Sequence, residues 1–505
     1  MAEQQARVYT LAAPTGGWNT RDPVAGMKAE SASIMDNFFP EPGTVLMRRG
    51  STTWATGLPA AVKSLIEYTP ETGTGELFAV SDGGIYSVTG SGAVGAAVVS
   101  GLSTSIVNSV QMGTSGGHFA LVFTGGDAPR IYNGTTWGTT PAITGPTAAN
   151  LIWASVHHNR LWVGEVNSLS GWYLAVDSIG GAAAEFDFSS ISTRGGYLVG
   201  MGTWTRDAGD GPDDVAVFLT SEGEVFIYQG TDPSSISTWG LTGVFKVGKP
   251  IGRKCMVKAG PDLLIVTEDG IIAVSSIFNQ DHSQQASTAL SAAINPTINA
   301  SVRSYGSLHG WQPIIYPKGM QLILNVPISS TTAYQYVWNT VTRAACRFTG
   351  MPALCWGLLS GAPYFGTPSG TVVQYDIGTS DNGSAIAGNV VQAFSNCGTN
   401  NNKSFKKVDL LIQSAGNPSI AIDLHLDYQV STPTGIAQES PSPAALWGVS
   451  LWGSGLWGTN NQIYRGWRGV TGIARTVALR VRSSTTTTRP GWVSTTFSYI
   501  VGAMV

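Results

Sequence analysis

The most informative segment of the chain is Val215-Ala-Val-Phe-Leu-Thr-Ser-Glu-Gly-Glu-Val-Phe-Ile-Tyr228. An apolar run rich in Val and Phe is followed by a polar turn at 220–223 and by a second apolar run that ends in Tyr228. Turn residues of this kind supply positive φ, and β-branched and aromatic residues favour a pleated, half-buried surface. The segment therefore predicts a β-hairpin.

The same pattern recurs along the first three quarters of the chain. Seven such hairpins lie at 77–88, 120–132, 160–174, 215–228, 263–274, 321–338 and 363–375. The turn glycines Gly84 and Gly126 are 42 residues apart, and Gly223 and Gly270 are 47 apart, which leaves room for about four strands per repeat. We therefore expect residues 51–380 to form a β-propeller-like domain of six or seven blades.

Two insertions interrupt the repeats. The first is the polar segment Asp207-Ala-Gly-Asp-Gly-Pro-Asp-Asp214. The second contains Gln285-Ala-Ser-Thr-Ala-Leu-Ser-Ala-Ala-Ile294, an Ala-rich run without turn residues, followed by Asn295-Pro296. It predicts a helix over 285–294 that ends at this Asn-Pro pair, because proline disfavours a helical conformation in the residue before it.

The pattern changes after Tyr375. Asp376-Ile-Gly-Thr-Ser-Asp-Asn-Gly383 is rich in turn residues, and longer alternating strands follow at 408–413, 420–428, 476–482 and 492–500. Alternation with a period of two predicts a β-sandwich-like domain at 381–505. Residues 381–505 carry a net charge of +4 and the remainder −7, which indicates different partners for the two parts. Residues 1–50 are expected to form an extended docking segment.

Composition restricts the class of protein. The chain has 505 residues with 43% hydrophobic and 12% charged residues, against about 25% charged in an average soluble domain. This content excludes intrinsic disorder, and no apolar run approaches the roughly 18 residues of a membrane-spanning helix. Residues 1–10 lack the basic and apolar pattern of a secretory signal, so we expect folding in a cytoplasm. Cys255, Cys346, Cys355 and Cys397 are widely spaced and are expected to be reduced core residues.

Few residues form patterns that indicate chemistry. His157-His158 invites a metal or general-base reading, but no third ligand is near in sequence, so we expect a structural role. The cluster Asp207, Asp210, Asp213 and Asp214 departs from the spacing of a calcium loop and is expected to be a solvated insertion. No nucleophile, paired-carboxylate or phosphate-loop motif is evident in the sequence. The chain is therefore predicted to be no enzyme and to hold no metal or cofactor.

An unusual segment lies at 446–458, where Trp447, Trp452 and Trp457 recur every five residues. A period of five matches neither a strand nor a helix, and three indoles in water would form an exposed apolar patch. Two readings stay open: packing beneath the sandwich within one chain, or an intersubunit contact. Stacking on carbohydrate is a third and weaker alternative.

Several segments together resemble a known family. They are Gly16-Gly-Trp-Asn-Thr-Arg-Asp-Pro-Val24, Met35-Asp-Asn-Phe-Phe-Pro-Glu-Pro-Gly-Thr-Val-Leu-Met-Arg-Arg-Gly50, the segment 376–383, the hairpin at 364–372, Asp427-Tyr428 and the Trp-rich segment. These motifs resemble the tail tubular protein B, or tail nozzle, family of short-tailed bacteriophages. Arg343-Ala-Ala-Cys-Arg-Phe348 departs from the pattern, because family members often carry Trp there.

The resemblance implies a virion structural protein in the phage tail, folded and assembled in the host cytoplasm. It implies a homohexameric ring that attaches to the adaptor, or head–tail connector, below the portal, meets tail fibre or spike proteins, and forms a conduit for DNA ejection. DNA would pass without specific binding, which agrees with a chain that supplies few cationic contacts, and no stable membrane insertion is expected. The alternative is a propeller-type tail protein that binds or cleaves glycans at the host surface.

Overall fold

The computed structural model describes residues 5–205, 214–278, 282–430, 436–437 and 462–502. The chain divides into two compact units. The sandwich unit comprises residues 1–52, 335–351 and 376–505, and the propeller unit comprises 53–334 and 352–375.

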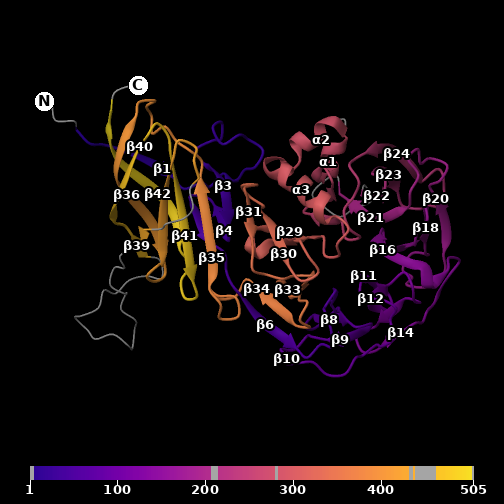
Figure 1. Cartoon of the computed structure of the whole chain (residues 1–505). Coiled ribbons are helices and arrows are strands. Elements are labelled where there is room, and N and C mark those ends of the chain that lie inside the picture. The colour runs from indigo at the N-terminus through magenta and orange to yellow at the C-terminus, as the bar shows by residue number, and fades with distance from the viewer. Residues whose placement is uncertain (1–4, 206–213, 279–281, 431–435, 438–461, 503–505) are drawn as a thin grey trace. The chain divides into compact units, whose positions relative to one another are not determined.

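Within the described residues, seven sheets succeed one another in chain order in the propeller unit (Figure 1). Their innermost strands are β7 (Ser64–Tyr68), β11 (Asn108–Thr114), β16 (Leu151–His157), β21 (Leu198–Trp204), β25 (Met256–Ala259), β28 (Gln312–Tyr316) and β32 (Cys355–Leu359). The second strands are β8 (Glu76–Ser81), β12 (Gly117–Phe123), β17 (Arg160–Glu165), β22 (Val215–Thr220), β26 (Asp262–Thr267), β29 (Gln321–Pro327) and β33 (Ala362–Gly366). Each second strand pairs antiparallel with its innermost strand.

Outer strands complete most of these sheets. The third strands are β9 (Gly84–Ser87), β13 (Arg130–Tyr132), β18 (Ser170–Tyr173), β23 (Glu224–Gly230), β27 (Gly270–Ala273) and β34 (Val372–Tyr375). Fourth strands are β14 (Trp137–Gly138), β20 (Ala184–Asp187) and β24 (Trp239–Lys246). Short strands β10 (Gly92–Ala93), β15 (Ile143–Thr144) and β19 (Gly181–Ala182) lie in the connections.

The seven sheets form a closed ring. Each innermost strand lies beside the innermost strand of the next sheet, and β32 of the last sheet lies beside β7 of the first. The last sheet is extended by β6 (Ser51–Thr56), which precedes the first sheet in sequence and so fastens the two ends of the ring together. An apolar cluster between the last and first sheets, with Leu65, Leu77, Cys355 and Tyr364, packs this closure. The fold is a seven-bladed β-propeller, and the all-β prediction is confirmed.

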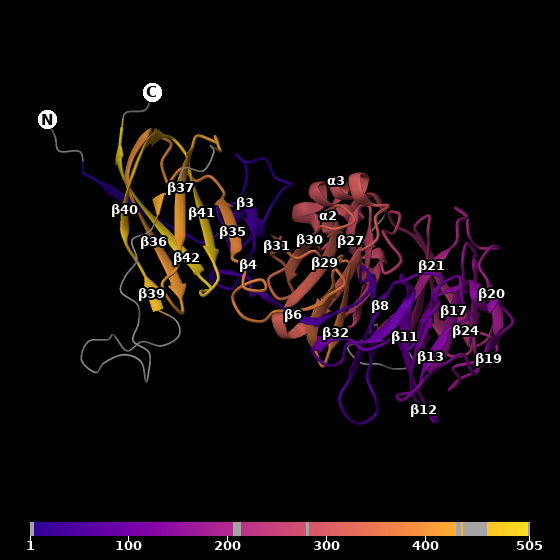
Figure 2. The same ribbon diagram turned by 60° about the horizontal axis from the view of Figure 1, so that its bottom comes forward.

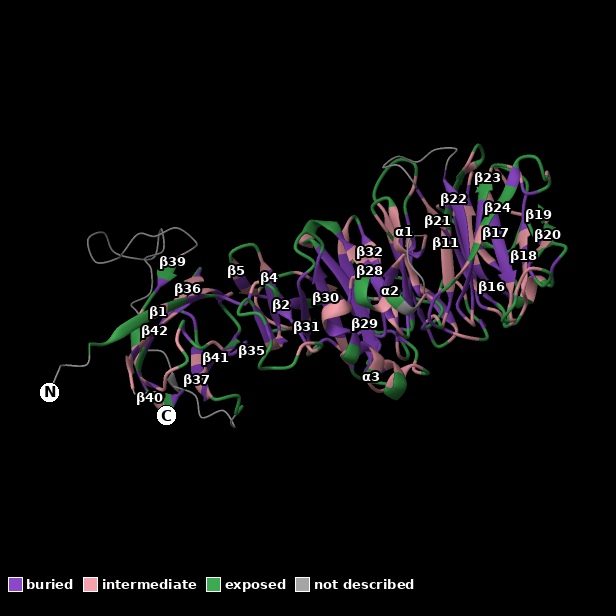
Figure 3. Ribbon diagram, turned by 90° about the horizontal axis from the view of Figure 1, so that it is seen from above, coloured by how far each residue is buried: buried purple, intermediate pink, exposed green. Residues whose placement is uncertain are grey.

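Hydrophobic packing between neighbouring blades supplies the core of the propeller. Trp162 of β17 stacks on Trp239 of β24 with ring centroids 5.8 Å apart, and Phe188 lies 4.6 Å from Phe218. These rings belong to one buried cluster that joins the third and fourth blades. Buried residues accordingly run along strands such as β17 and β22 (Figure 3). Aromatic pairs of this geometry contribute about 0.5–1.5 kcal/mol each beyond the area that they bury.

The sequence located the hairpins well and the turn residues within a position. Gly223, with φ +78°, closes the β22–β23 turn, and the Cβ of any other residue there would lie 2.4 Å from the carbonyl oxygen of Val247. In the pair Gly83-Gly84 the positive φ of +67° belongs to Gly83, not to Gly84 as expected. The hairpin at 321–338 was assigned wholly to the propeller, yet its second half lies in the sandwich unit.

The helical insertion follows the fifth blade. It contains α1 (Val274–Ile277), α2 (His282–Thr288), a 3₁₀ turn (Ala292–Ile294) and α3 (Asn295–Tyr305), and further 3₁₀ turns lie at Ala148–Asn150 and Pro317–Gly319. The helix predicted over 285–294 is thus broken in two, and the prediction that Asn295-Pro296 ends it is wrong. Pro296 instead stands in the first turn of α3, where its missing N–H costs no intrahelical hydrogen bond.

The sandwich unit contains two sheets that pack face to face (Figure 2). One contains β39 (Gln462–Tyr464), β36 (Lys403–Ser414), β42 (Gly491–Val501), β5 (Thr44–Met47) and β4 (Phe38–Glu41), with β1 (Arg7–Ala12) on β42 and β40 (Trp467–Ala474) on β36. The other belongs to a ten-stranded sheet that also includes β28 and β29. Its strands in this unit are β30 (Ala333–Asn339), β31 (Ala345–Phe348), β3 (Ser31–Asp36), β35 (Ile386–Gln392), β41 (Val477–Thr485), β37 (Ile420–Leu426) and β38 (Ile436–Ala437), with β2 (Gly17–Trp18) on β3.

The division of the chain differs from the expected domains in two respects. Residues 335–351, expected in the propeller, belong to the sandwich unit, and residues 1–50 do not form a separate docking segment. They supply β1, which pairs with β42 from Arg7–Tyr499 to Ala12–Ser494, and strands β2 to β5. The sandwich is therefore built from three separate stretches of chain, because its long C-terminal strands need partners that 381–505 alone does not provide.

Candidate functional site

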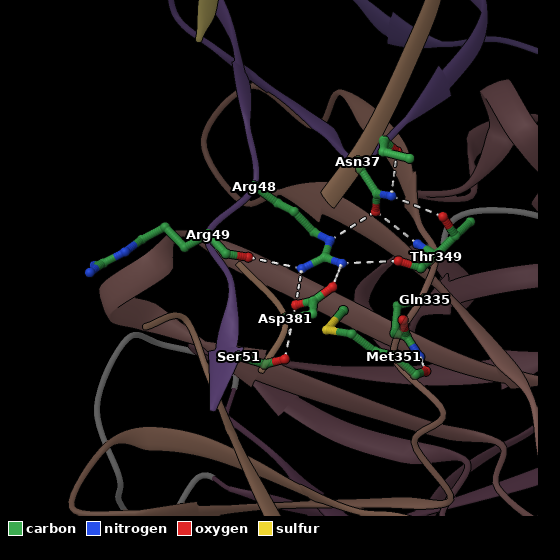
Figure 4. Close-up of polar contacts among 9 residues, drawn as sticks. Asn37, Arg48, Arg49, Ser51, Gln335, Thr349, Met351 and Asp381 are labelled. Atoms are coloured by element: carbon green, nitrogen blue, oxygen red, sulfur yellow. Dashed lines mark hydrogen bonds and ion pairs between the residues drawn. The ribbon is translucent and has the colours of Figure 1, made fainter. Parts of the chain in front are cut away.

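A buried arginine joins the three stretches of the sandwich unit. The side chain of Arg48, directly after β5, has no exposed surface, and each N–H of its guanidinium donates a hydrogen bond (Figure 4). Nε donates to Asn37 Oδ1 at 2.8 Å, Nη1 to the Arg49 carbonyl at 2.9 Å, and Nη2 to the Thr349 carbonyl at 3.0 Å. Both Nη atoms also donate to the carboxylate of Asp381, which forms a bidentate ion pair.

Asn37 completes this Arg48 junction. It occupies the left-handed region, with φ +56°, at the turn between β3 and β4, a conformation that asparagine tolerates better than most residues. Its Oδ1 also accepts the N–H of Thr349 at 2.9 Å, and its Nδ2 donates to Thr349 Oγ1 and to the Ala387 carbonyl. The amide therefore links residues from all three stretches without leaving a polar atom unused.

The chain next to Arg48 passes very close to the segment 376–383. A Cβ on Gly50 would lie 2.1 Å from the carbonyl oxygen of Ser380, so no other residue fits there without a shift of the backbone. Ser51 Oγ donates to Asp381 Oδ1 at 2.9 Å. Two of the segments that carry the family resemblance, 35–50 and 376–383, thus meet at one junction. Sequence reasoning quoted Arg48 only within a motif, since nothing in sequence reveals a partner 333 residues away.

A second candidate site is the axial channel of the propeller, a cavity of about 430 Å³. All seven innermost strands or the residues just before them contribute to its wall, including Glu67 of β7, Gln111 of β11, Trp153 of β16, Met201 of β21, Lys254 before β25, Gln312 of β28 and Trp356 of β32. Its volume is that of a small-molecule pocket. No polymer as wide as a DNA duplex can pass through one propeller.

Two opposite charges face each other in the channel. Burial raises the pKa of Glu67, although the Leu358 N–H, which donates to Glu67 Oε1 at 2.6 Å, and the charge of Lys254 both act against that shift. Burial lowers the pKa of Lys254, and the nearby Cys355 and Glu67 oppose this. Neither residue stood out in the sequence, because a single charge in a strand or loop is ordinarily solvated.

The predicted histidine pair lies at the far end of the innermost strands. His157, the last residue of β16, is buried and its Nδ1 lies 3.0 Å from Thr203 Oγ1, while its ring stands 4.1 Å from that of His158. Burial, with a smaller contribution from His158, lowers the pKa of His157 to about 3, so its ring is neutral at pH 7. Both residues line a cavity of about 410 Å³ with Asp214.

The other predicted residues divide between the described and the undescribed parts of the chain. Among the described residues, no group of three His, Cys, Asp or Glu side chains is placed to hold a metal ion. Asp207, Asp210 and Asp213 lie outside the described residues, as do Trp447, Trp452 and Trp457, so the two readings of the Trp-rich segment stay open.

The four cysteines are all free and buried, as the sequence predicted. Burial raises the pKa values of Cys255 and Cys355 to about 12 and that of Cys397 to about 11. These thiols are therefore protonated and unreactive at neutral pH. The helices within the described residues are all too short or too polar to cross a membrane.

No family model and no curated protein matches the chain. Solved structures give weak likenesses. The WD40 β-propeller domain of Doa1 is 11% identical, with a TM-score of 0.40 over 65% of this chain and 97% of that chain. One chain of the crystal structure of BBS1N in complex with ARL6DN is 10% identical, with a TM-score of 0.41 over 66% of this chain and 99% of that chain. PorZ of the Porphyromonas gingivalis type-IX secretion system is 15% identical, with a TM-score of 0.37 over 64% of this chain and 37% of that chain. Likenesses this weak carry no argument, and the propeller assignment rests on the closed ring of strands.

Proposed function

We propose that the chain is a virion structural protein, a subunit of a phage tail nozzle whose function is geometric. The observation that carries the proposal is the Arg48 junction, at which the resembling segments 35–50 and 376–383 meet. Residues with this role hold a fold together and transfer no protons or groups. Their shared position explains why a resemblance would persist in segments so far apart in sequence.

The volume of the axial channel bears on how such a subunit would conduct DNA. A cavity of about 430 Å³ in one propeller admits a small molecule and not a duplex. A conduit must therefore be enclosed by several copies around a common axis. The low content of charged residues, 12%, suits a wall that DNA slides past, since affinity for phosphates comes from Lys and Arg contacts.

One sheet of the sandwich unit offers a surface for such contacts between copies. Its peripheral strands β1, β39 and β40 expose large apolar side chains: Val8 is 65% exposed, Ile463 61%, Trp467 47% and Ile473 71%. β1 pairs with β42, whereas β39 and β40 pair with β36, so these side chains lie at both edges of the sheet. Exposed apolar residues on sheet edges are typical of interaction surfaces. The Trp-rich segment directly precedes β39 in sequence, and the proposal takes the intersubunit reading of it.

The experiment is to determine the oligomeric state of the purified full chain by sedimentation velocity and negative-stain microscopy. We expect closed rings of six. Ile473→Asp should weaken the rings, whereas Ile236→Asp, at a 98% exposed position of the propeller unit, serves as the matched control and should not. A monomer or trimer that binds bacterial polysaccharide would contradict the proposal and favour the glycan-binding alternative.

A further inference from the structure

A third cavity opens where the innermost strands of the propeller begin. Its volume is about 230 Å³, and loops before β7, β11, β25, β28 and β32 contribute to its wall. It shares Asn108, Arg253, Lys254 and Gln312 with the axial channel, so we call it the channel mouth. All of its lining residues belong to the propeller unit.

The channel mouth is lined by basic residues without acidic ones. Lys63, Arg253, Lys254 and His309 take part in its wall, and none of its lining residues is Asp or Glu. His309 Nε2 lies 2.9 Å from the carbonyl oxygen of Lys63, which ties the 306–310 loop to the start of β7. Within the described part of the chain, neither Lys63, Arg253 nor Lys254 forms an ion pair with a carboxylate.

These charges are close enough to act on one another. Removal from water lowers the pKa of His309, its hydrogen bond to the Lys63 carbonyl raises it, and the positive charges of Lys254, Lys63 and Arg253 each lower it further. Burial also lowers the pKa of Arg253. Glu67, deeper in the channel, offsets part of the charge of Lys254, but one carboxylate against three cations leaves an excess of positive charge.

We propose that the channel mouth binds a phosphate group. Like charges gathered around one cavity repel one another, and a bound anion converts that repulsion into attraction. Arg253 offers the planar fork that matches an oxyanion, and Lys63 and Lys254 offer ammonium groups. The group has two sources, free inorganic phosphate or the phosphodiester backbone of DNA. This inference does not depend on the proposed nozzle function.

The test is calorimetric titration of the full chain with inorganic phosphate at low ionic strength, where screening is weak. We compare wild type with Arg253→Gln and with the matched control Arg303→Gln, which removes the same charge from an exposed position on α3. Because Arg253→Gln removes a charge-assisted hydrogen bond to the anion, it should weaken binding by about tenfold or more. Arg303→Gln should bind as wild type does. The thermal unfolding of each variant without phosphate checks that it folds.

A competition arm separates the two sources. If a short DNA duplex displaces phosphate from the wild type, the site takes a backbone phosphodiester, and if it does not, the ligand is free phosphate. Lys63→Gln provides a second variant in case Arg253→Gln does not fold. Absence of phosphate binding to the wild type would overturn the proposal, and so would an equal loss of affinity in Arg253→Gln and Arg303→Gln.

Discussion

Replacing Asp381 by alanine should loosen the sandwich unit selectively. The change removes the bidentate partner of Arg48 and leaves a guanidinium with no exposed surface without a counter-charge. Removal of one partner of a buried ion pair costs about 3–5 kcal/mol. We expect the lower end, about 3 kcal/mol, because Arg48 keeps Asn37 Oδ1 and two carbonyl oxygens as acceptors and the Asp381 side chain is itself 17% exposed.

Amide hydrogen exchange read by mass spectrometry measures this loss unit by unit. A loss of about 3 kcal/mol corresponds to roughly a hundredfold faster exchange for amides that exchange through opening of the unit. Peptides from β36 and β42 should show this acceleration, and peptides from β17 and β22 of the propeller unit should not. Asp22→Ala breaks the solvent-screened pair with Arg21 and is the matched control, which should accelerate exchange in β36 and β42 far less than Asp381→Ala does.

A double variant tests the physical reason. If the cost comes from the unpaired charge, Arg48→Met combined with Asp381→Ala should be less destabilised than Asp381→Ala alone, since no charge is left buried. The reasoning is refuted if exchange in β36 and β42 changes by less than about threefold in Asp381→Ala. It is equally refuted if the double variant is the less stable of the two.

Three further predictions concern other parts of the chain. His157→Leu should flatten the pH dependence of the free energy of unfolding, as measured by urea titrations at several pH values. In the wild type the pKa of His157 is about 3 in the folded state and 6.5 in the unfolded state, so stability is lost as the pH falls through this interval, by up to about 1.4 kcal/mol per pH unit. Gly223→Ala should lower the melting temperature and reduce the free energy of unfolding by about 1–2 kcal/mol or more, because φ at this position is +78° and the new Cβ would meet the Val247 carbonyl. Gly240→Ala is the control: its Cβ would meet open space, and it should change the free energy of unfolding by less than about 0.5 kcal/mol. Trp452→Ala should lower ring stability in sedimentation while the melting temperature of the monomer stays within a few degrees; persistent rings with an early-melting monomer would assign the tryptophans to the subunit core.

Local patterns explain what the sequence could predict. The pattern of each hairpin lies within about a dozen consecutive residues, as at 215–228, so the hairpins could be recognised and the number of blades predicted as six or seven. The N-terminal segment could not be placed, because β1 finds its partner in β42 at the other end of the chain. The same reason hides Arg48 and Lys254: a charge in sequence is read as solvated until the fold shows what surrounds it. Turn chemistry also misled at Asn295-Pro296, which can end one helix or begin another.

Pairing of the first strand with the last has a consequence for the order of events during synthesis. Thr10 of β1 contacts Thr496 of β42, 486 positions further along the chain. At roughly 5–20 residues per second, β1 leaves the ribosome about 25–100 s before its partner exists. The propeller, whose closing strand β6 also emerges early, can close once β34 is made, while the N-terminal strands still wait with their edges uncovered. During synthesis the strands within residues 1–50 are therefore the segment most exposed to aggregation. A chaperone that covers these strands would raise the yield of the folded subunit without shortening any folding step.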